Sequence, residues 1–133
     1  MRFLAYAWAG PNSLVGVALG LLMSLAGARP RILRGALEFS GGALGAVIAI
    51  PVARIPFRAI TFGHVILGVN AATLDAAREH EHVHVRQYEA WGPFFLPAYV
   101  ASSLWQLACG RRCYRDNWFE RQAYDACGAG CPP

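Results

Sequence analysis

His80, Glu81 and His84 form the pattern H-E-x-x-H, the most informative group of chemical side chains in the sequence. On a helix, positions four apart lie on the same face one turn apart, so both imidazoles can bind one Zn²⁺ ion. Glu81 is rotated by one residue, which places its carboxylate beside the metal rather than on it. There it can accept a proton from a water molecule that the metal activates. The pattern predicts His80 and His84 as metal ligands and Glu81 as general base.

Glu120 offers a third ligand. Residues 116–125, DNWFERQAYD, are typical of a helix capped by Asp116 or Asn117, with Glu120 in its first turns. Catalytic zinc commonly takes two histidines and a glutamate, with a fourth position left for water. Asp125 is suited to accept a hydrogen bond from a ligand imidazole. The alternative for Glu120 is an ordinary surface carboxylate.

The H-E-x-x-H pattern lies in a strong helix signal. Residues 73–91, TLDAAREHEHVHVRQYEAW, are rich in helix formers, with Asn70 or Thr73 as cap and Gly92-Pro93 as a stop. This helix must position both imidazoles.

A competing pattern uses alternate residues of a strand. His82, His84 and Glu89 fit H-x-H-x4-E, with which cupin barrels hold a metal. The glycines that accompany this pattern are missing at Ala76 and Leu96, and the chain lacks the many short strands of a barrel. The flanking residues favour the helix.

The stretch REHEHVHVRQYEAWGPFFLPAY, followed by YRDNWFERQAYD, resembles small bacterial proteins related to zincin metallopeptidases of the gluzincin kind. The likeness covers residues 64–124, although Trp118 stands where the family pattern has Pro. It implies the zinc ligands His80, His84 and Glu120, the general base Glu81 and a peptide or protein substrate. It also implies a minimal zincin-like fold with an active-site helix and a later ligand helix.

Two segments in the first half of the chain predict β structure. Residues 31–39 suit a small hairpin about Gly35, and residues 59–69 suit a strand bent at Gly63. Residues 42–50 are apolar and ambiguous, and Pro51 and Pro56 bracket an irregular connection. We therefore expect an α+β fold.

His64 lies on the predicted strand that could serve as an edge strand in this fold. Zincins lay an extended substrate along such a strand by β-augmentation, which makes His64 a candidate substrate-binding residue. A buried core or capping histidine is the alternative.

Residues 3–28 carry no charge, and Leu14–Ala26 predicts an apolar helix capped by Asn12 or Ser13. This segment is either membrane-associated, a signal peptide cleaved at Ala26-Gly27-Ala28, or a helix packed on the domain. We expect membrane association through residues 3–28, followed by a zincin-like domain over residues 29–133. The arginines that follow the apolar segment favour a cytoplasmic position for that domain.

A second uncharged run, residues 93–109, cannot cross a bilayer if His84 and Glu120 bind the same ion. If this run crossed the bilayer, the residues after it would have to return through the lipid to bring Glu120 back to His84. These residues include Arg111, Arg112 and Arg115, which are costly in lipid. We expect a helix packed beneath the active-site helix.

All four cysteines lie in the last 25 residues, so the body of the fold cannot depend on them. The spacings Cys109–Cys113 and Cys127–Cys131 fit structural zinc, disulfides or free thiols.

The composition excludes several classes of protein. The chain has 133 residues, of which 56% are hydrophobic and 15% charged, which excludes a disordered chain. All 12 basic residues are scattered arginines, which gives no nucleic-acid-binding patch, and without lysine there can be no lysine nucleophile. The H-E-x-x-H pattern, Glu120 and the apolar N-terminal segment predict a membrane-associated zinc metallopeptidase, and the family resemblance implies a bacterial one. The alternative from another class is a non-catalytic, metal-stabilised membrane or interaction protein.

Overall fold

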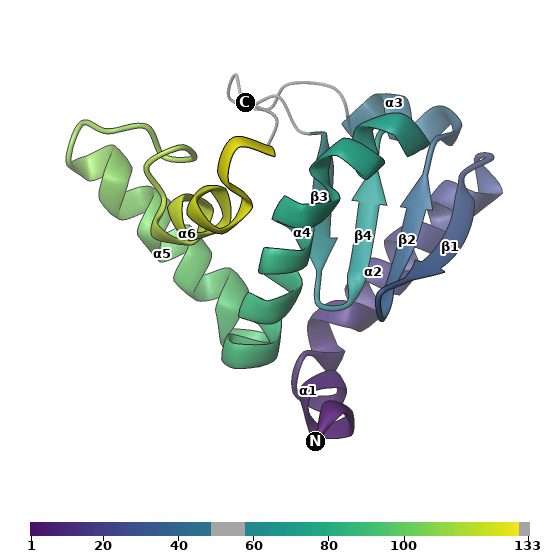
Figure 1. Ribbon diagram of the computed structural model, residues 1–133, viewed down its shortest axis with the longest axis horizontal. Helices are drawn as coiled ribbons and strands as arrows, with labels where there is room; N and C mark the ends of the chain where they lie inside the picture. The colour runs from purple at the N-terminus through teal and green to yellow at the C-terminus, as the bar shows by residue number, and fades with distance from the viewer. Residues whose placement is uncertain (49–57, 131–133) are drawn as a thin grey trace.

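The computed structural model describes residues 1–48 and 58–130, which form helices around a small sheet (Figure 1). The predicted α+β class is confirmed. The elements of the first half are α1 (Arg2–Trp8), α2 (Gly10–Leu25), β1 (Arg29–Leu33), β2 (Ala36–Ser40), α3 (Gly42–Ile48), β3 (Ala59–Phe62) and β4 (Val65–Gly68). Those of the second half are α4 (Ala71–Trp91), η1 (Gly92–Phe94), α5 (Phe95–Ala108), α6 (Trp118–Cys127) and η2 (Gly128–Gly130).

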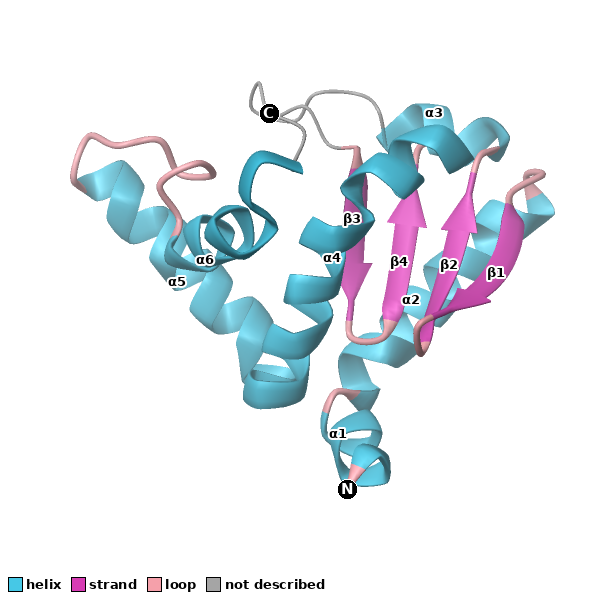
Figure 2. Ribbon diagram, in the orientation of Figure 1, coloured by secondary structure: helices cyan, strands magenta, loops and turns pink. Residues whose placement is uncertain are grey.

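The four strands form one mixed sheet in the order β1-β2-β4-β3. β2 and β4 are parallel, whereas β1 pairs with β2 and β3 pairs with β4 in antiparallel fashion. Helix α2 covers one face of the sheet, and α4 runs along the other face beside β3 (Figure 2). Since β3 lies at an edge of the sheet, the helices that follow α4 can pack next to it.

The hairpin predicted about Gly35 is confirmed, with Arg34 and Gly35 at positive φ in its turn. The single bent strand predicted over residues 59–69 is wrong, because β3 and β4 form a second hairpin that turns at Gly63-His64. Gly63 has a φ of +61°, and a Cβ there would lie 2.1 Å from Ser13 Oγ. Glycine is therefore favoured at position 63 for two reasons, the positive φ of the turn and the close approach of α2.

Helix α2 is the predicted apolar helix, but neither Asn12 nor Ser13 caps it. The helix begins earlier, at Gly10, with Pro11 in its first turn and Ala9 as the N-cap residue. Pro is well tolerated there because the first backbone N–H groups have no helical partner. Asn12 instead donates a hydrogen bond to the backbone oxygen of Gly92, at the end of α4.

No single helix in residues 1–48 and 58–130 is both long enough and apolar enough to cross a membrane alone. Helices α1 and α2 pass that test only as a pair, and they are bent by 71° relative to one another. The packed interpretation of the apolar segment matches the contacts of α2 with the sheet.

Helix α4 confirms the helix predicted around the histidines. Asn70 is its cap, with its side chain accepting a hydrogen bond from Thr73 N at 2.8 Å, and Gly92 ends it at positive φ. The buried Glu38 of β2 accepts two hydrogen bonds from Arg78, at 2.8 and 3.0 Å, which fasten α4 to the sheet.

Helices α5 and α6 follow as the sequence predicts. Helix α5 packs against both α4 and α6, and α6 begins after its cap Asn117, which accepts a hydrogen bond from Phe119 N. The ambiguous run that begins at residue 42 forms α3 as far as Ile48, while the connection around Pro51 and Pro56 lies outside the described residues.

Candidate metal centre

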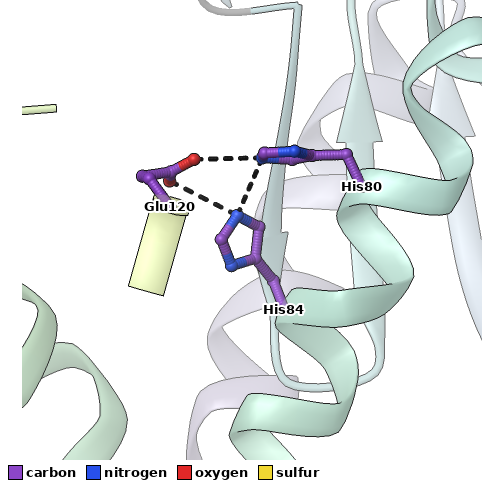
Figure 3. A group of neighbouring side chains, drawn as sticks. All are labelled: His80, His84 and Glu120. Carbon is purple, nitrogen blue, oxygen red and sulfur yellow. Dashed lines mark hydrogen bonds and ion pairs between the residues drawn. The ribbon is translucent and has the colours of Figure 1, made fainter. Parts of the chain in front are cut away.

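His80 and His84 from α4 and Glu120 from α6 point toward one another (Figure 3). Nε2 of His80 lies 3.1 Å from Nε2 of His84 and 3.0 Å from Oε2 of Glu120. Nε2 of His84 lies 3.3 Å from Oε1 of Glu120. All three residues are buried, so two imidazoles of α4 and one carboxylate from a helix far along the chain meet in the interior of the protein.

These three side chains can hold one metal ion. Tetrahedral metal–ligand bonds of about 2.0–2.2 Å place neighbouring ligand atoms about 3.3–3.6 Å apart. The separations of 3.0, 3.1 and 3.3 Å are close to this spacing. An accidental cluster of buried polar groups would not require both histidines to direct the same ring nitrogen to one point.

Gln87 sets the orientation of the His84 ring. Its amide Nε2 donates to the backbone oxygen of Phe119 at 3.1 Å and to Oε1 of Gln122 at 2.8 Å. Its Oε1 therefore faces His84 as an acceptor, 2.8 Å from Nδ1. Since Nδ1 must carry the proton of that bond, Nε2 is the nitrogen whose lone pair is available to a metal.

In the metal-free protein, Glu120 favours the protonated form of the His84 imidazole. Burial opposes a charge on His84, but its hydrogen bond and attraction to Glu120 outweigh burial and raise the pKa of His84 to about 9. Burial also opposes the carboxylate of Glu120, yet hydrogen bonds to His80 and His84 lower its pKa well below the ordinary value. Metal binding therefore displaces a proton from His84, since a ligand imidazole must be neutral.

Tyr99 of α5 supports the carboxylate ligand by donating a hydrogen bond to Oε1 of Glu120 at 2.6 Å. Burial, together with the charge of Glu120, raises the pKa of Tyr99 far above its ordinary value, so the hydroxyl keeps its proton. Asn117 joins the two helices by donating to the backbone oxygen of Tyr99 at 3.0 Å and to Ser103 Oγ at 2.7 Å. These bonds fix the position of Glu120 relative to α5.

The metal centre borders a cavity of about 210 Å³ between β3 and the helices α4 and α5. All four residues of β3 line it, and Glu81, His84 and Glu120 face it from the helices. A water molecule occupies about 30 Å³ of liquid volume, so the cavity has room for water and part of a small ligand. Two of the three predicted ligands, His84 and Glu120, and the predicted base Glu81 therefore border one space.

Thr61 of the edge strand holds Glu81. Its hydroxyl donates to Oε2 of Glu81 at 2.7 Å, which leaves Oε1 of that carboxylate free of this bond. The backbone oxygen of Thr61 accepts a hydrogen bond from the Tyr88 hydroxyl at 3.1 Å. Two contacts from α4 thus fix one residue of β3 beside the cavity.

The structure does not bring His64 to this cavity. His64 lies in the turn between β3 and β4, where it is buried, stacks on Tyr6 and contacts Glu89 through Nε2 at 3.0 Å. Among the described contacts of His64, this arrangement matches the alternative of a buried packing residue. Its role in substrate binding stays a prediction.

Asp125 lies on the exposed side of α6. The hydrogen bond to a ligand imidazole that was predicted for it is made at His84 by Gln87. His82 and Glu89, the other members of the strand pattern, lie on α4 and are not in the group that can hold a metal.

The cysteines are separate from the metal centre. Cys109 and Cys113 are free thiols, and Cys127 is disulfide-bonded. Cys113 lines the cavity, but no cysteine is part of the metal-holding group found among residues 1–48 and 58–130. Cys131 lies outside the described residues.

Sequence reasoning missed the roles of Gln87, Thr61 and Tyr99. Gln87 had a signal, because it lies three residues after His84 on the same face of the helix. Thr61 and Tyr99 had no such signal. Thr61 binds Glu81, 20 residues away in the sequence, and Tyr99 binds Glu120, 21 residues away, and in each pair the two residues lie on different elements.

Comparisons of the chain with protein-family models, curated proteins and solved structures find no match. The resemblance to zincin metallopeptidases therefore stays a prediction.

Proposed function

We propose that this chain is a zinc metallopeptidase that hydrolyses a peptide bond in a peptide or protein substrate. The observation that supports it best is that His80, His84 and Glu120 can hold a metal beside a cavity that Glu81 also faces. A metal site of purely structural use would not need a carboxylate next to its ligands at the wall of an open space. This arrangement fits hydrolysis of a bound substrate by water.

Zinc is the metal we propose, because two imidazole nitrogens and one carboxylate oxygen are the donor set of many catalytic zinc sites. When bound, zinc would lower the pKa of water and polarise the carbonyl group of the scissile bond. Gln87 would keep His84 in the tautomer that binds metal, and Tyr99 would keep the Glu120 carboxylate in place.

Glu81 would act as general base and then as general acid. Its carboxylate would accept a proton from the attacking water and deliver that proton to the departing amine nitrogen. The Thr61 hydroxyl fixes one oxygen of this carboxylate, so the other can be presented to the water. The substrate would lie in the cavity next to β3, whose four residues line it.

The experiment combines metal analysis with three variants of the purified protein. Wild type is expected to contain close to one equivalent of zinc and to cleave members of a fluorogenic peptide library. Glu81→Gln should keep the zinc and lose cleavage, whereas His84→Ala should lose both. Glu89→Gln is the matched control, because Glu89 lies on the same helix but outside the residues that line the cavity.

Three results would contradict the proposal. A wild-type protein that binds no zinc, even when zinc is supplied in excess, would exclude the metal centre. Zinc binding with cleavage that is equal in wild type and Glu81→Gln would exclude Glu81 as the base. Zinc binding without any cleavage of the library would favour the alternative of a non-catalytic, metal-stabilised protein.

A further inference from the structure

Helix α2 has its bulky apolar side chains on the outside of the molecule. The side that faces the sheet carries the buried residues Asn12, Gly16, Gly20 and Met23. A Cβ at Gly16 would lie 2.6 Å from Cβ of Val65, so the helix backbone approaches the sheet closely. The opposite side forms a stripe, here called the outer face, made of Leu14, Val15, Ala18, Leu21, Leu22 and Leu25.

This pattern is the reverse of that of a helix on a water-exposed surface. Such a helix presents charged or polar side chains on its outer side, and a helix that is apolar all round is buried or in contact with lipid. Leu14 is 72% exposed and Leu25 is 88% exposed, and no charged residue occurs between Phe3 and Ala28. Small residues inside and leucines outside are the arrangement of helices whose outer side chains face lipid.

The charges at the two ends of α2 favour lipid over a second copy of the chain. Arg2, at the start of α1, precedes the apolar segment and Arg29 follows it directly, and both are exposed. The first acidic residue of the chain is Glu38, which is buried. Two copies packed through the outer face would therefore bring basic ends together in either orientation. Anionic lipid headgroups would neutralise the same arginines.

The helix cannot cross the bilayer as it stands. Its 16 residues span about 24 Å, against about 30 Å for a hydrocarbon core. Its inner face is also engaged with the sheet. A helix with one face free and the other committed can bury the free face at the interface while lying in the plane of the membrane.

We propose that the outer face of α2 binds the surface of an anionic lipid bilayer, with the helix axis parallel to the membrane. The inference is independent of the proposed peptidase activity. It also orients the molecule, because α4 lies on the opposite face of the sheet from α2 (Figure 2). The helix that carries His80 and His84 is then separated from the lipid by the sheet.

The test measures binding of the purified full chain to vesicles by co-sedimentation. Wild type should bind vesicles of phosphatidylcholine and phosphatidylglycerol, and at least tenfold more weakly vesicles of phosphatidylcholine alone. The double variant Leu21→Gln/Leu25→Gln should bind the anionic vesicles at least tenfold more weakly than wild type. The matched control is Leu104→Gln/Leu107→Gln, two leucines of α5 that are about as exposed as Leu21 but on another side of the molecule.

Ala18→Asp is a second variant that is safe for the fold, since the small side chain of Ala18 is exposed in the middle of the outer face. It should weaken binding to the anionic vesicles to a similar degree. The proposal is overturned if wild type does not bind these vesicles, or if the α5 control loses as much binding as the α2 variants. It is also overturned if wild type is a dimer that Ala18→Asp dissociates while vesicle binding is unchanged.

Discussion

Replacing Gln87 by leucine tests whether the His84 ring is held for metal binding. Leucine is similar in size to glutamine but cannot accept the hydrogen bond from Nδ1 of His84. The ring would lose the contact that selects its tautomer, while the three metal ligands themselves stay unchanged. The effect should therefore appear in metal affinity and not in the number of ions bound.

The size of the effect follows from the role of Gln87. Loss of a hydrogen-bond partner of a metal-bound imidazole typically costs 10–100-fold in metal affinity. We expect Gln87→Leu to weaken zinc binding by about 10–100-fold, or about 1.4–2.7 kcal/mol. Gln122→Leu is the control, because it removes one of the two acceptors of the Gln87 amide and leaves the other, the backbone oxygen of Phe119.

The assay is competition between the protein and a chelator of known zinc affinity, with Co²⁺ absorption as a probe of coordination. Gln122→Leu should stay within about threefold of wild type, because the retained bond still orients the amide of Gln87. Equal zinc affinity of Gln87→Leu and wild type would refute the orientation argument. Equal losses in both variants would point to general disturbance of the packing of α4 against α6.

Three further predictions concern the base, the sheet and the metal-free cluster. Thr61→Val removes the hydrogen bond to Glu81 and should lower kcat by about 10-fold or more with little change in KM. Thr61→Ser keeps the hydroxyl and should keep most of the activity. Equal kcat values for the two variants in a peptide-cleavage assay would contradict this prediction. Gly20→Ala would place a Cβ 2.2 Å from the ring of the buried Phe39 and should lower the free energy of unfolding by about 1–3 kcal/mol, as measured by chemical denaturation. Gly10→Ala is the control and should not destabilise the fold, because a Cβ at Gly10 would have no neighbouring atom within 4 Å. The pKa of His84 is raised from 6.5 to about 9 on folding, so its contribution to the stability of the metal-free protein is present below pH 6.5 and is lost as the pH rises to 9. The loss is at most roughly 3 kcal/mol. Denaturation of chelator-treated protein at several pH values checks this, and a stability that rises over this range would show that His84 is neutral.

The helices that carry the metal ligands could be predicted because each has its own signals. Helix α4 has the cap Asn70, the stop at Gly92 and a long run of helix formers, and α6 has the cap Asn117. Their meeting could not be derived from these signals, since it depends on how α5 returns the chain. It was predicted from the kind of ligand that accompanies the H-E-x-x-H pattern.

Two errors have a common physical cause. The hairpin at Gly63 looked like one strand because both of its four-residue strands are mostly apolar and the turn holds just two residues. The start of α2 was placed too late because Asn12 and Ser13 look like caps, but both make tertiary contacts instead. In each case a contact with a distant segment outweighed the local preference, and a single sequence does not contain that contact.

The edge strand β3 has a consequence for how a peptide would be recognised. Alternate residues of a strand present their backbone groups to the same side, so a strand of four residues offers two of them to an incoming chain. The oxygen of Thr61 is already engaged by the Tyr88 hydroxyl. Main-chain hydrogen bonds from β3 would thus bind only a very short stretch of peptide. Discrimination between substrates would depend on the side chain nearest the scissile bond, and long flanking sequences would add little affinity.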